Sequence, residues 1–259
     1  MKDNPLIAVL IPSYNHAKYL PNLFQSLLDQ TYTNLQIILS DDASTDNSKS
    51  ICDQWYPRLE GKFGGGVKFI YHSINFGDKA WSNIKLLSSE VTDADYIQYC
   101  ESDDYFKPDK FEKQLTYLRA NSEFSAVHTD VESVDENGEI CPFFWRANRA
   151  SQTGGDPIIP TGDVRKQLEF CNFIYTCTMM VETALHKKHF KFDYFQKELN
   201  TGFGDYPFFL SLSKEAKIGY IDESLSVYRI LSNSLSHGDR PWIIDRTAHI
   251  KMLASKGII

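Results

Sequence analysis

The stretch LIAVLIPSYN, residues 6–15, decides the fold class of this chain. Residues 6–11 form a continuous apolar run, which is typical of a strand that helices cover on both faces of a sheet. Mostly apolar segments at residues 35–39, 67–71 and 96–100 predict three further strands. Between these runs apolar side chains recur at helical spacing, as at Leu20, Leu23, Phe24, Leu27 and Leu28. Strands that alternate with helices predict an α/β fold with a mainly parallel sheet flanked by helices.

The second half of the chain predicts a less regular arrangement. We expect strands at residues 124–131, 175–181, 218–221 and 226–229, and helices at residues 163–170, from 205 and from 241. Residues 135–138 have the composition of a turn. Residues 142–162 are rich in Pro, Gly, Asn and Thr, which predicts a long loop of the kind that often serves as a lid or binding segment.

The composition excludes several classes of protein. The 259 residues include 27 Lys and Arg against 34 Asp and Glu, a formal net charge of −7, and 42% are hydrophobic, as in a folded globular protein. The acidic balance argues against nucleic-acid binding, which needs a basic face. The apolar run at residues 7–11 is too short for a signal peptide or a membrane-spanning helix, so we expect neither. The five cysteines form no C-x-x-C pair, which favours a reduced, cytoplasmic setting.

Polar clusters follow three of the expected strands. They are Pro12-Ser13-Tyr14-Asn15, Ser40-Asp41-Asp42 and Glu101-Ser102-Asp103-Asp104. In an open parallel sheet the carboxyl ends of the strands share one edge, and ligands bind there. Adjacent carboxylates repel one another, and a hard divalent cation such as Mg²⁺ or Mn²⁺ relieves that repulsion. The alternative is that these aspartates only cap helices and turns.

The sequence resembles the family 2 glycosyltransferases, inverting enzymes that have the GT-A fold and use nucleotide-sugar donors. The resemblance rests on residues 9–15, 26–32 and 40–46 in this order and spacing, on Asn75-Phe76-Gly77 and on the carboxylates that end at Asp104. It extends over residues 5–237. It implies a GT-A-like, mainly parallel but mixed sheet with a Rossmann-like nucleotide half. We therefore expect a single domain, 1–259, with a nucleotide-binding half at 1–130 and an acceptor-binding half at 131–259.

The resemblance also implies how the donor binds. Pro12 and Tyr14 would line the base pocket, with Tyr14 stacked on the ring, and Asp42 would accept a hydrogen bond from the base. Asp103 would lie near the ribose. The remaining expected nucleotide-binding residues are Asn15 and Asn75, which belong to the same motifs.

The implied chemistry uses two further carboxylates. Asp104 would ligate the divalent metal, Mn²⁺ or Mg²⁺, that bridges the donor diphosphate. Asp205 falls where the family keeps its catalytic base, and a positioned base contributes about 10²–10⁴-fold to such a reaction. The alternative is that Asp205 is the N-cap of the helix that follows. His237 lies in a stretch that resembles the family's C-terminal element near the diphosphate, and is a candidate metal ligand or a solvated residue.

Several features bear on the type of transfer. The family usually has Asp where Glu101 stands, and often Glu where Gly204 stands. The Gln-x-x-Arg-Trp motif and the membrane helices of the processive polysaccharide synthases are missing, which favours addition of one sugar or a few. Arg229 could pair with phosphate or with an internal carboxylate such as Asp222 or Glu223.

The acceptor side is less defined by the sequence. Phe143 and Trp145 are candidates to stack on an acceptor sugar, or to pack a lid. Residues 240–256 mix apolar and basic side chains, which would suit peripheral membrane association with a lipid-linked acceptor, although packing on the domain is the favoured interpretation. His186 and His189, beside two lysines, are interpreted as a solvated basic face.

The resemblance thus implies a metal-assisted glycosyltransferase that uses a UDP-sugar and acts on a glycan or lipid-linked acceptor in bacterial cell-surface glycan synthesis. It would work in the cytoplasm, either free or at the inner face of the membrane. A sugar nucleotidyltransferase is one alternative, but it would carry a glycine-rich basic loop after the first strand. A non-catalytic nucleotide-sugar binding module is the other, and the intact carboxylates argue against it.

Overall fold

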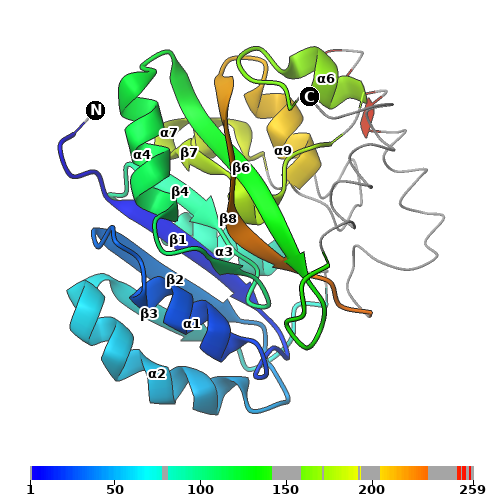
Figure 1. Cartoon of the computed structure of the whole chain (residues 1–259). Coiled ribbons are helices and arrows are strands. Elements are labelled where there is room, and N and C mark those ends of the chain that lie inside the picture. The colour runs from blue at the N-terminus through cyan, green and yellow to red at the C-terminus, as the bar shows by residue number, and fades with distance from the viewer. Residues whose placement is uncertain are drawn as a thin grey trace.

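Figure 1 shows the computed structural model of the chain, which describes residues 2–77, 81–141, 159–170, 172–191, 193, 205–232, 250–251, 253–254 and 257. In this part of the chain the strands form one sheet of eight, in the order β3-β2-β1-β4-β7-β6-β8-β5. Helices cover both faces of the sheet (Figure 1), so the predicted α/β class with a mixed, flanked sheet is confirmed. Within the described ranges, none of the helices is long and apolar enough to cross a membrane.

Four parallel strands build one half of the sheet. They are β1 (Ile7–Ser13), β2 (Leu35–Asp41), β3 (Val67–Tyr71) and β4 (Tyr96–Tyr99). The strand β1 pairs with β2 on one side, where Ser13 lies opposite Asp41, and with β4 on the other, where Leu10 lies opposite Tyr99. The carboxyl ends of β1, β2 and β4 therefore meet at one edge, and the polar segments that follow them lie together.

The other half of the sheet mixes strand directions. The strand β7 (Met180–Glu182) is antiparallel to both β4 and β6 (Phe124–Val134), β8 (Lys217–Arg229) is parallel to β6, and β5 (Tyr105–Phe106) is antiparallel to β8. Two separate strands were expected within β8. The structure has one, because Ile221 pairs with Thr129 and Ser224 with the next residue of β6, so that a bulge absorbs the extra residues.

Each face of the sheet has its own apolar core. One core packs under α1 (Leu20–Leu28), α2 (Ser48–Phe63) and α4 (Lys110–Ala120). The other packs under α3 (Trp81–Ser89), α6 (Arg165–Phe170), α7 (Thr183–His189) and α9 (Asp205–Leu212). Two 3₁₀ turns, η1 (Gly64–Gly66) and η2 (Thr176–Thr178), complete the described elements. Successive residues of β1 enter alternate cores, Val9 the first and Leu10 the second, as the pleat of a strand requires.

Two local predictions differ from the structure. Ser44 has the residue type of an N-cap and precedes a helix predicted to carry Ile51 and Trp55, but it does not cap α2. It donates its backbone N–H and its hydroxyl to the Asp41 carboxylate instead, at 2.8 Å and 2.6 Å. Much of the strand expected at residues 175–181 is the turn η2, because the N–H and hydroxyl of Thr178 both donate to the carbonyl of Tyr175, at 2.9 Å and 2.7 Å.

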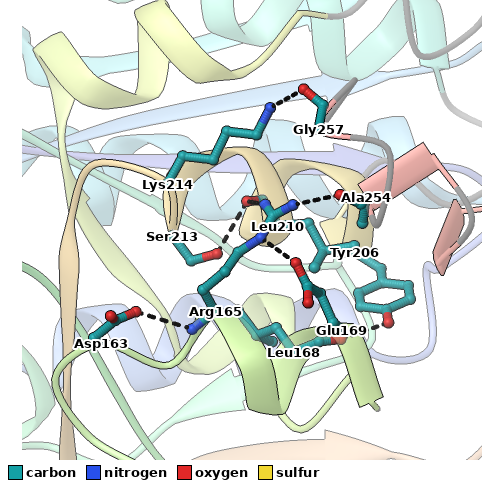
Figure 2. A network of polar contacts seen from close by, with 10 residues as sticks. All are labelled: Asp163, Arg165, Leu168, Glu169, Tyr206, Leu210, Ser213, Lys214, Ala254 and Gly257. Atoms are coloured by element: carbon teal, nitrogen blue, oxygen red, sulfur yellow. Dashed lines mark hydrogen bonds and ion pairs between the residues drawn. The ribbon is translucent and has the colours of Figure 1, made fainter.

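Arg165 fixes the position of α9, whose first residue is Asp205 (Figure 2). Its guanidinium donates to the carbonyl oxygen of Leu210 in α9 and, at 3.1 Å, to the carbonyl oxygen of Ala254. The Tyr206 hydroxyl, also in α9, donates to the carbonyl oxygen of Leu168 in α6 at 2.6 Å. Because Arg165 is largely buried, these bonds hold α9 against α6 more firmly than an exposed pair would.

The C-terminal residues that the structure describes pack on the body of the protein. Ile250, Leu253 and Ala254 are buried in the same apolar core as α9. Lys214 donates to the carbonyl oxygen of Gly257 at 2.9 Å (Figure 2). Within residues 240–256 the structure describes only 250–251 and 253–254, and these pack on the domain; the rest of that segment lies outside the described residues.

Candidate active site

The loop after β1 is joined to the loop after β2. Pro12 is buried at the end of β1, and Tyr14 beyond it is 45% exposed, so its ring is available to a ligand. Asn15 has φ = 55°, a left-handed conformation that Asn tolerates better than most residues. Its side-chain oxygen accepts the N–H of Thr45 at 2.8 Å, and its own N–H donates to the Ser44 hydroxyl at 2.7 Å. Asn15 therefore braces two loops at the rim of the sheet.

Asp42 and Asn75 form a second connected pair at this rim. The Asp42 N–H donates to the carbonyl of Ser13 at 2.9 Å, and one of its carboxylate oxygens accepts the N–H of Phe76 at 2.9 Å. The amide of Asn75 donates to the Asp42 carbonyl at 2.8 Å and accepts the N–H of Gly77 at 2.7 Å. The structure thus joins Asp42, which the resemblance assigns to the base, to Asn75, which it assigns to nucleotide binding.

His16 connects this rim to the acidic segment after β4. Its Nδ1 lies 2.8 Å from the hydroxyl of Ser102 and 3.8 Å from a carboxylate oxygen of Asp103. Its backbone N–H donates to Ser48 at 3.2 Å, at the start of α2. Sequence reasoning did not single out His16 or Ser102. The signal available was the position of His16, directly after the polar residues that end β1.

The acidic segment Glu101–Asp104 presents its carboxyl groups differently. Asp104 is 1% exposed, whereas Glu101 and Asp103 are partly exposed. One oxygen of Asp104 accepts the backbone N–H of Arg229 at 2.8 Å. The other, Oδ2, is buried and has no hydrogen-bond partner among the described residues. A buried carboxylate oxygen without a partner is costly, and a bound cation would satisfy it.

Arg229 stabilises the segment from inside. It is 3% exposed, and its guanidinium donates to the carbonyl oxygens of Asp103 and Asp135, each at 3.0 Å. The guanidinium carbon also lies 4.8 Å from the centre of the Tyr19 ring. Arg229 therefore holds main-chain carbonyls around the acidic segment, rather than pairing with Asp222 or Glu223.

Asp205 belongs to the same acidic cluster. It opens α9 and is partly exposed, and its Oδ2 accepts a hydrogen bond from Thr176 Oγ1 at 3.4 Å. Burial of the carboxyl within the protein raises its pKa above the usual range, although the N–H of Tyr206 opposes that shift. Its position at a helix start is compatible with both interpretations of the sequence, a catalytic base and a residue at a helix N-terminus.

These carboxyl groups are close enough to shift one another's pKa values. Burial and the nearby charges of Asp103 and Asp205 raise the pKa of Glu101 to about 7. Burial, Asp103 and Glu101 raise the pKa of Asp104 well above its usual range, and burial raises that of Asp103. Asp205 and the segment after β4 are about a hundred residues apart in sequence, and the fold places them within electrostatic reach of each other.

The described residues could supply part of the coordination of a divalent metal, with a bound ligand supplying the rest. No group of three or more His, Cys, Asp or Glu side chains is arranged as a complete metal site in the described part of the chain. Asp104 offers one buried carboxylate oxygen without a partner. Mg²⁺ and similar ions are commonly bound by one or two carboxylates, and the phosphates of a ligand complete their coordination. The donor atoms described here match that arrangement.

Some predicted residues lie outside the described part of the chain. These are the candidate metal ligand His237 and the candidate acceptor residues Phe143 and Trp145.

The interpretation of His186 and His189 as a solvated face is wrong. Both belong to α7 and are only 1% and 7% exposed, because their side chains pack against neighbouring elements. Tyr99 lies 3.2 Å from His186 Nε2, and burial lowers the pKa of His186 to about 3.

Comparison with known proteins shows the family of this chain. Residues 8–189 match the family described as Glycosyl transferase family 2, and the chain belongs to that family. An uncharacterized glycosyltransferase of Haemophilus influenzae is 27% identical over 239 residues, which cover 91% of this chain and 69% of that protein. The putative teichuronic acid biosynthesis glycosyltransferase TuaG of Bacillus subtilis is 25% identical over 233 residues, 90% of this chain and 82% of TuaG.

Solved structures share the fold at low sequence identity. The crystal structure of S. aureus TarS 1–349 in complex with UDP-GlcNAc has a TM-score of 0.68 and 16% identity, covering 96% of this chain and 66% of that one. The mannosyltransferase PcManGT from Pyrobaculum calidifontis, in complex with GDP-Man and Mn²⁺, has a TM-score of 0.63 and 14% identity, covering 98% of this chain and 64% of that one. The chain spans 39% of the length of the longer TarS structure. The predicted GT-A-like fold is thereby confirmed.

Proposed function

We propose that this glycosyltransferase moves one sugar from a nucleoside diphosphate donor, a UDP-sugar, to an acceptor hydroxyl, with inversion and with help from a divalent metal. The observation that carries the proposal is that Glu101, in the acidic segment after β4, lies within electrostatic reach of Asp205 as well as of Asp103 and Asp104. His16, which follows Asn15 in the loop after β1, joins that loop to the acidic segment through Ser102.

The rim binds the nucleoside in this proposal. Pro12 and Tyr14 line the pocket for the base, and the exposed ring of Tyr14 stacks on it. Asp42 accepts a hydrogen bond from the base, and Asp103 contacts the ribose. Asn15 and Asn75 act by fixing the loops that carry these groups, as their hydrogen bonds to Thr45 and Asp42 indicate. UDP is supported by the fold shared with TarS, whose structure holds UDP-GlcNAc.

The acidic cluster supplies the chemistry. Asp104 would hold the metal through its unpartnered Oδ2, with His237 as a second candidate ligand. When bound, Mn²⁺ or Mg²⁺ stabilises the negative charge of the leaving diphosphate as a Lewis acid. The related fold of PcManGT, which binds GDP-Man and Mn²⁺, supports this assignment.

Asp205 accepts the proton of the acceptor hydroxyl. Its raised pKa makes the carboxylate a stronger base than an exposed aspartate, closer to the pH at which transfer occurs. Thr176 orients it by donating to Oδ2. Inversion needs one base on the acceptor side and no covalent intermediate, which is why a single aspartate suffices.

The similarity to TuaG supports a place in cell-surface polysaccharide synthesis. The acceptor is then a glycan or a lipid-linked sugar, and Phe143 and Trp145 are its candidate platforms. A cytoplasmic location at the inner face of the membrane, and the division into halves at 1–130 and 131–259, stay predictions.

Asp205→Asn tests the proposal. The amide keeps the shape of the side chain but cannot take a proton, so we expect the rate of transfer to fall by about 10²–10⁴-fold while UDP affinity stays unchanged. Release of UDP from a panel of UDP-sugars, with Mn²⁺ and candidate acceptors, measures transfer, and calorimetry measures UDP binding. The exposed Asp93→Asn is the matched control.

Near-normal transfer by Asp205→Asn would remove the assignment of the base. Nucleotide-sugar binding by the wild-type protein without any transfer would instead support a non-catalytic binding module.

A further inference from the structure

A lysine lies buried beneath the acidic cluster. Lys110, in the first turn of α4, is 0% exposed, and its ammonium nitrogen lies 5.4 Å from the centre of the Phe106 ring. Its hydrogen-bond partner among the described residues is the carbonyl oxygen of Thr178, at 3.1 Å. Burial lowers the pKa of Lys110 to about 7. A buried lysine with so few partners is costly to the fold, so it is expected only where its charge or its contact serves a purpose.

The carbonyl that Lys110 holds ends the turn η2. Gln114, one helical turn further along α4, donates to the same oxygen of Thr178 at 3.0 Å. From the opposite side, Gln98 in β4 donates to the carbonyl of Thr176 at 3.2 Å, and Ser226 in β8 donates to the carbonyl of Cys177 at 2.7 Å. Side chains from three elements therefore fix η2, and Lys110 is the charged one among these four donors.

The other side of η2 touches the acidic cluster. Thr176 donates its hydroxyl to Asp205 at 3.4 Å. The thiol of Cys177 is within reach of both charges, because Asp104 raises its pKa while Lys110 lowers it. Cys100, just before the acidic segment, responds to the same two charges. The turn η2 thus lies between the buried ammonium group and the carboxylates.

We propose that Lys110 is a positioning residue of the transfer reaction, which fixes η2 through the Thr178 carbonyl and so holds Thr176 against Asp205. This inference rests on the proposed role of Asp205. Lys110 does not touch the rim residues that bind the nucleoside, so its loss acts on turnover rather than on donor binding.

The test uses the full chain with two variants of Lys110. Lys110→Met keeps an unbranched apolar stem of similar length and removes both donor and charge, and Lys110→Gln keeps a donor without the charge. For each folded variant we expect kcat to fall at least tenfold, with the donor KM changed less than threefold. Lys113→Met, on the exposed side of the same helix, is the matched control and is expected to leave both constants unchanged. Thermal melting establishes that each variant is folded before its kinetics are compared.

A double-mutant cycle distinguishes positioning from simple structural support. Thr176→Val removes the contact with Asp205, and we expect Lys110→Met to cost less than twofold in kcat in the Thr176→Val background, because both changes break one chain of contacts. Fully additive losses, or Lys110→Met and Lys110→Gln with wild-type kcat, would overturn the inference and leave the proposed function intact.

Comparison with Asp205→Asn separates the two proposals. Loss of kcat in Lys110→Met while Asp205→Asn stays active would refute the route through Asp205 together with the assigned base. Loss in Asp205→Asn with none in the lysine variants would refute only the role of Lys110.

Discussion

The two sides of the carboxyl edge differ in how their polar groups are satisfied. On the side that we propose to bind the nucleoside, called the nucleoside side below, Asn15, Asp42 and Asn75 exchange hydrogen bonds with backbone groups of neighbouring loops. On the acidic side, Asp104 keeps a buried oxygen without a partner, and the pKa of Glu101 is raised by its neighbours. A satisfied set of groups keeps its shape without a ligand, whereas gathered carboxylates are unfavourable until positive charge arrives.

This contrast separates recognition from chemistry. The nucleoside side is preorganised, so a ligand finds its loops already in place and loses little free energy in ordering them. On the acidic side the carboxylates repel one another, and a bound divalent cation would relieve that repulsion. Substitutions on the two sides should therefore change different constants.

Asp104→Asn should have the largest effect. The amide retains the size of the side chain but not its charge, so we expect kcat/KM for the donor to fall about 100-fold or more, as when a group that stabilises transition-state charge is removed. The activation of the wild-type enzyme by Mn²⁺ should also be lost in the variant. Initial rates over a series of Mn²⁺ concentrations measure both effects.

The exposed Asp53→Asn serves as the control for this charge change. Wild-type transfer that persists undiminished after treatment with a chelator would contradict a metal role for Asp104.

The pH dependence of metal activation should be the next largest effect. The pKa of Glu101 is raised to about 7, so its carboxyl and those coupled to it take up protons as the pH falls through this range. Metal binding requires the ionised carboxylates, so the apparent Mn²⁺ affinity should fall by up to about tenfold per pH unit between pH 7 and pH 6 for each proton displaced. Mn²⁺ activation curves at several pH values measure this slope.

UDP binding without metal provides the internal reference, because the nucleoside side holds its groups by backbone hydrogen bonds. An Mn²⁺ affinity that does not change between pH 8 and pH 6 would show that the acidic cluster is ionised throughout.

Asn75→Ala should have the smallest effect of the three. It removes the hydrogen bond to the Asp42 carbonyl, which contributes roughly 1 kcal/mol, so the donor KM should rise about fivefold with kcat nearly unchanged. Asn121→Ala is the matched control, since Asn121 makes a comparable bond to a carbonyl at the end of α4. A variant that loses kcat and keeps KM would erase the distinction between the two sides.

Much of the nucleotide half could be predicted from local patterns. The apolar runs at residues 35–39 and 67–71 became β2 and β3, because such runs need cover on both faces wherever they lie in the chain. The meeting of the polar clusters followed from parallel strand order alone. Where two strands were expected in β8, the pattern failed, because the bulge opposite Asp130 depends on pairing with a distant strand.

Burial of charged residues could not be predicted in the same way. Lys110 is the first residue of the amphipathic helix α4, where a lysine is expected to face solvent, yet it is buried and donates to a carbonyl oxygen of η2. His186, in α7, is likewise buried, because it packs against Tyr99 at the end of β4. Their surroundings come from segments far away in the chain, which no local window contains.

The amino-acid order by itself determined the layered α/β architecture, the edge at which polar side chains collect, and membership of the family, since hydrophobic periodicity and motif spacing are local properties. Only the tertiary structure decided that Asp205 meets Glu101, that Asp104 keeps an unpartnered oxygen, and that a buried lysine lies behind them. The physical reason is that desolvation and charge interactions depend on three-dimensional distance, and chain folding sets that distance independently of sequence separation.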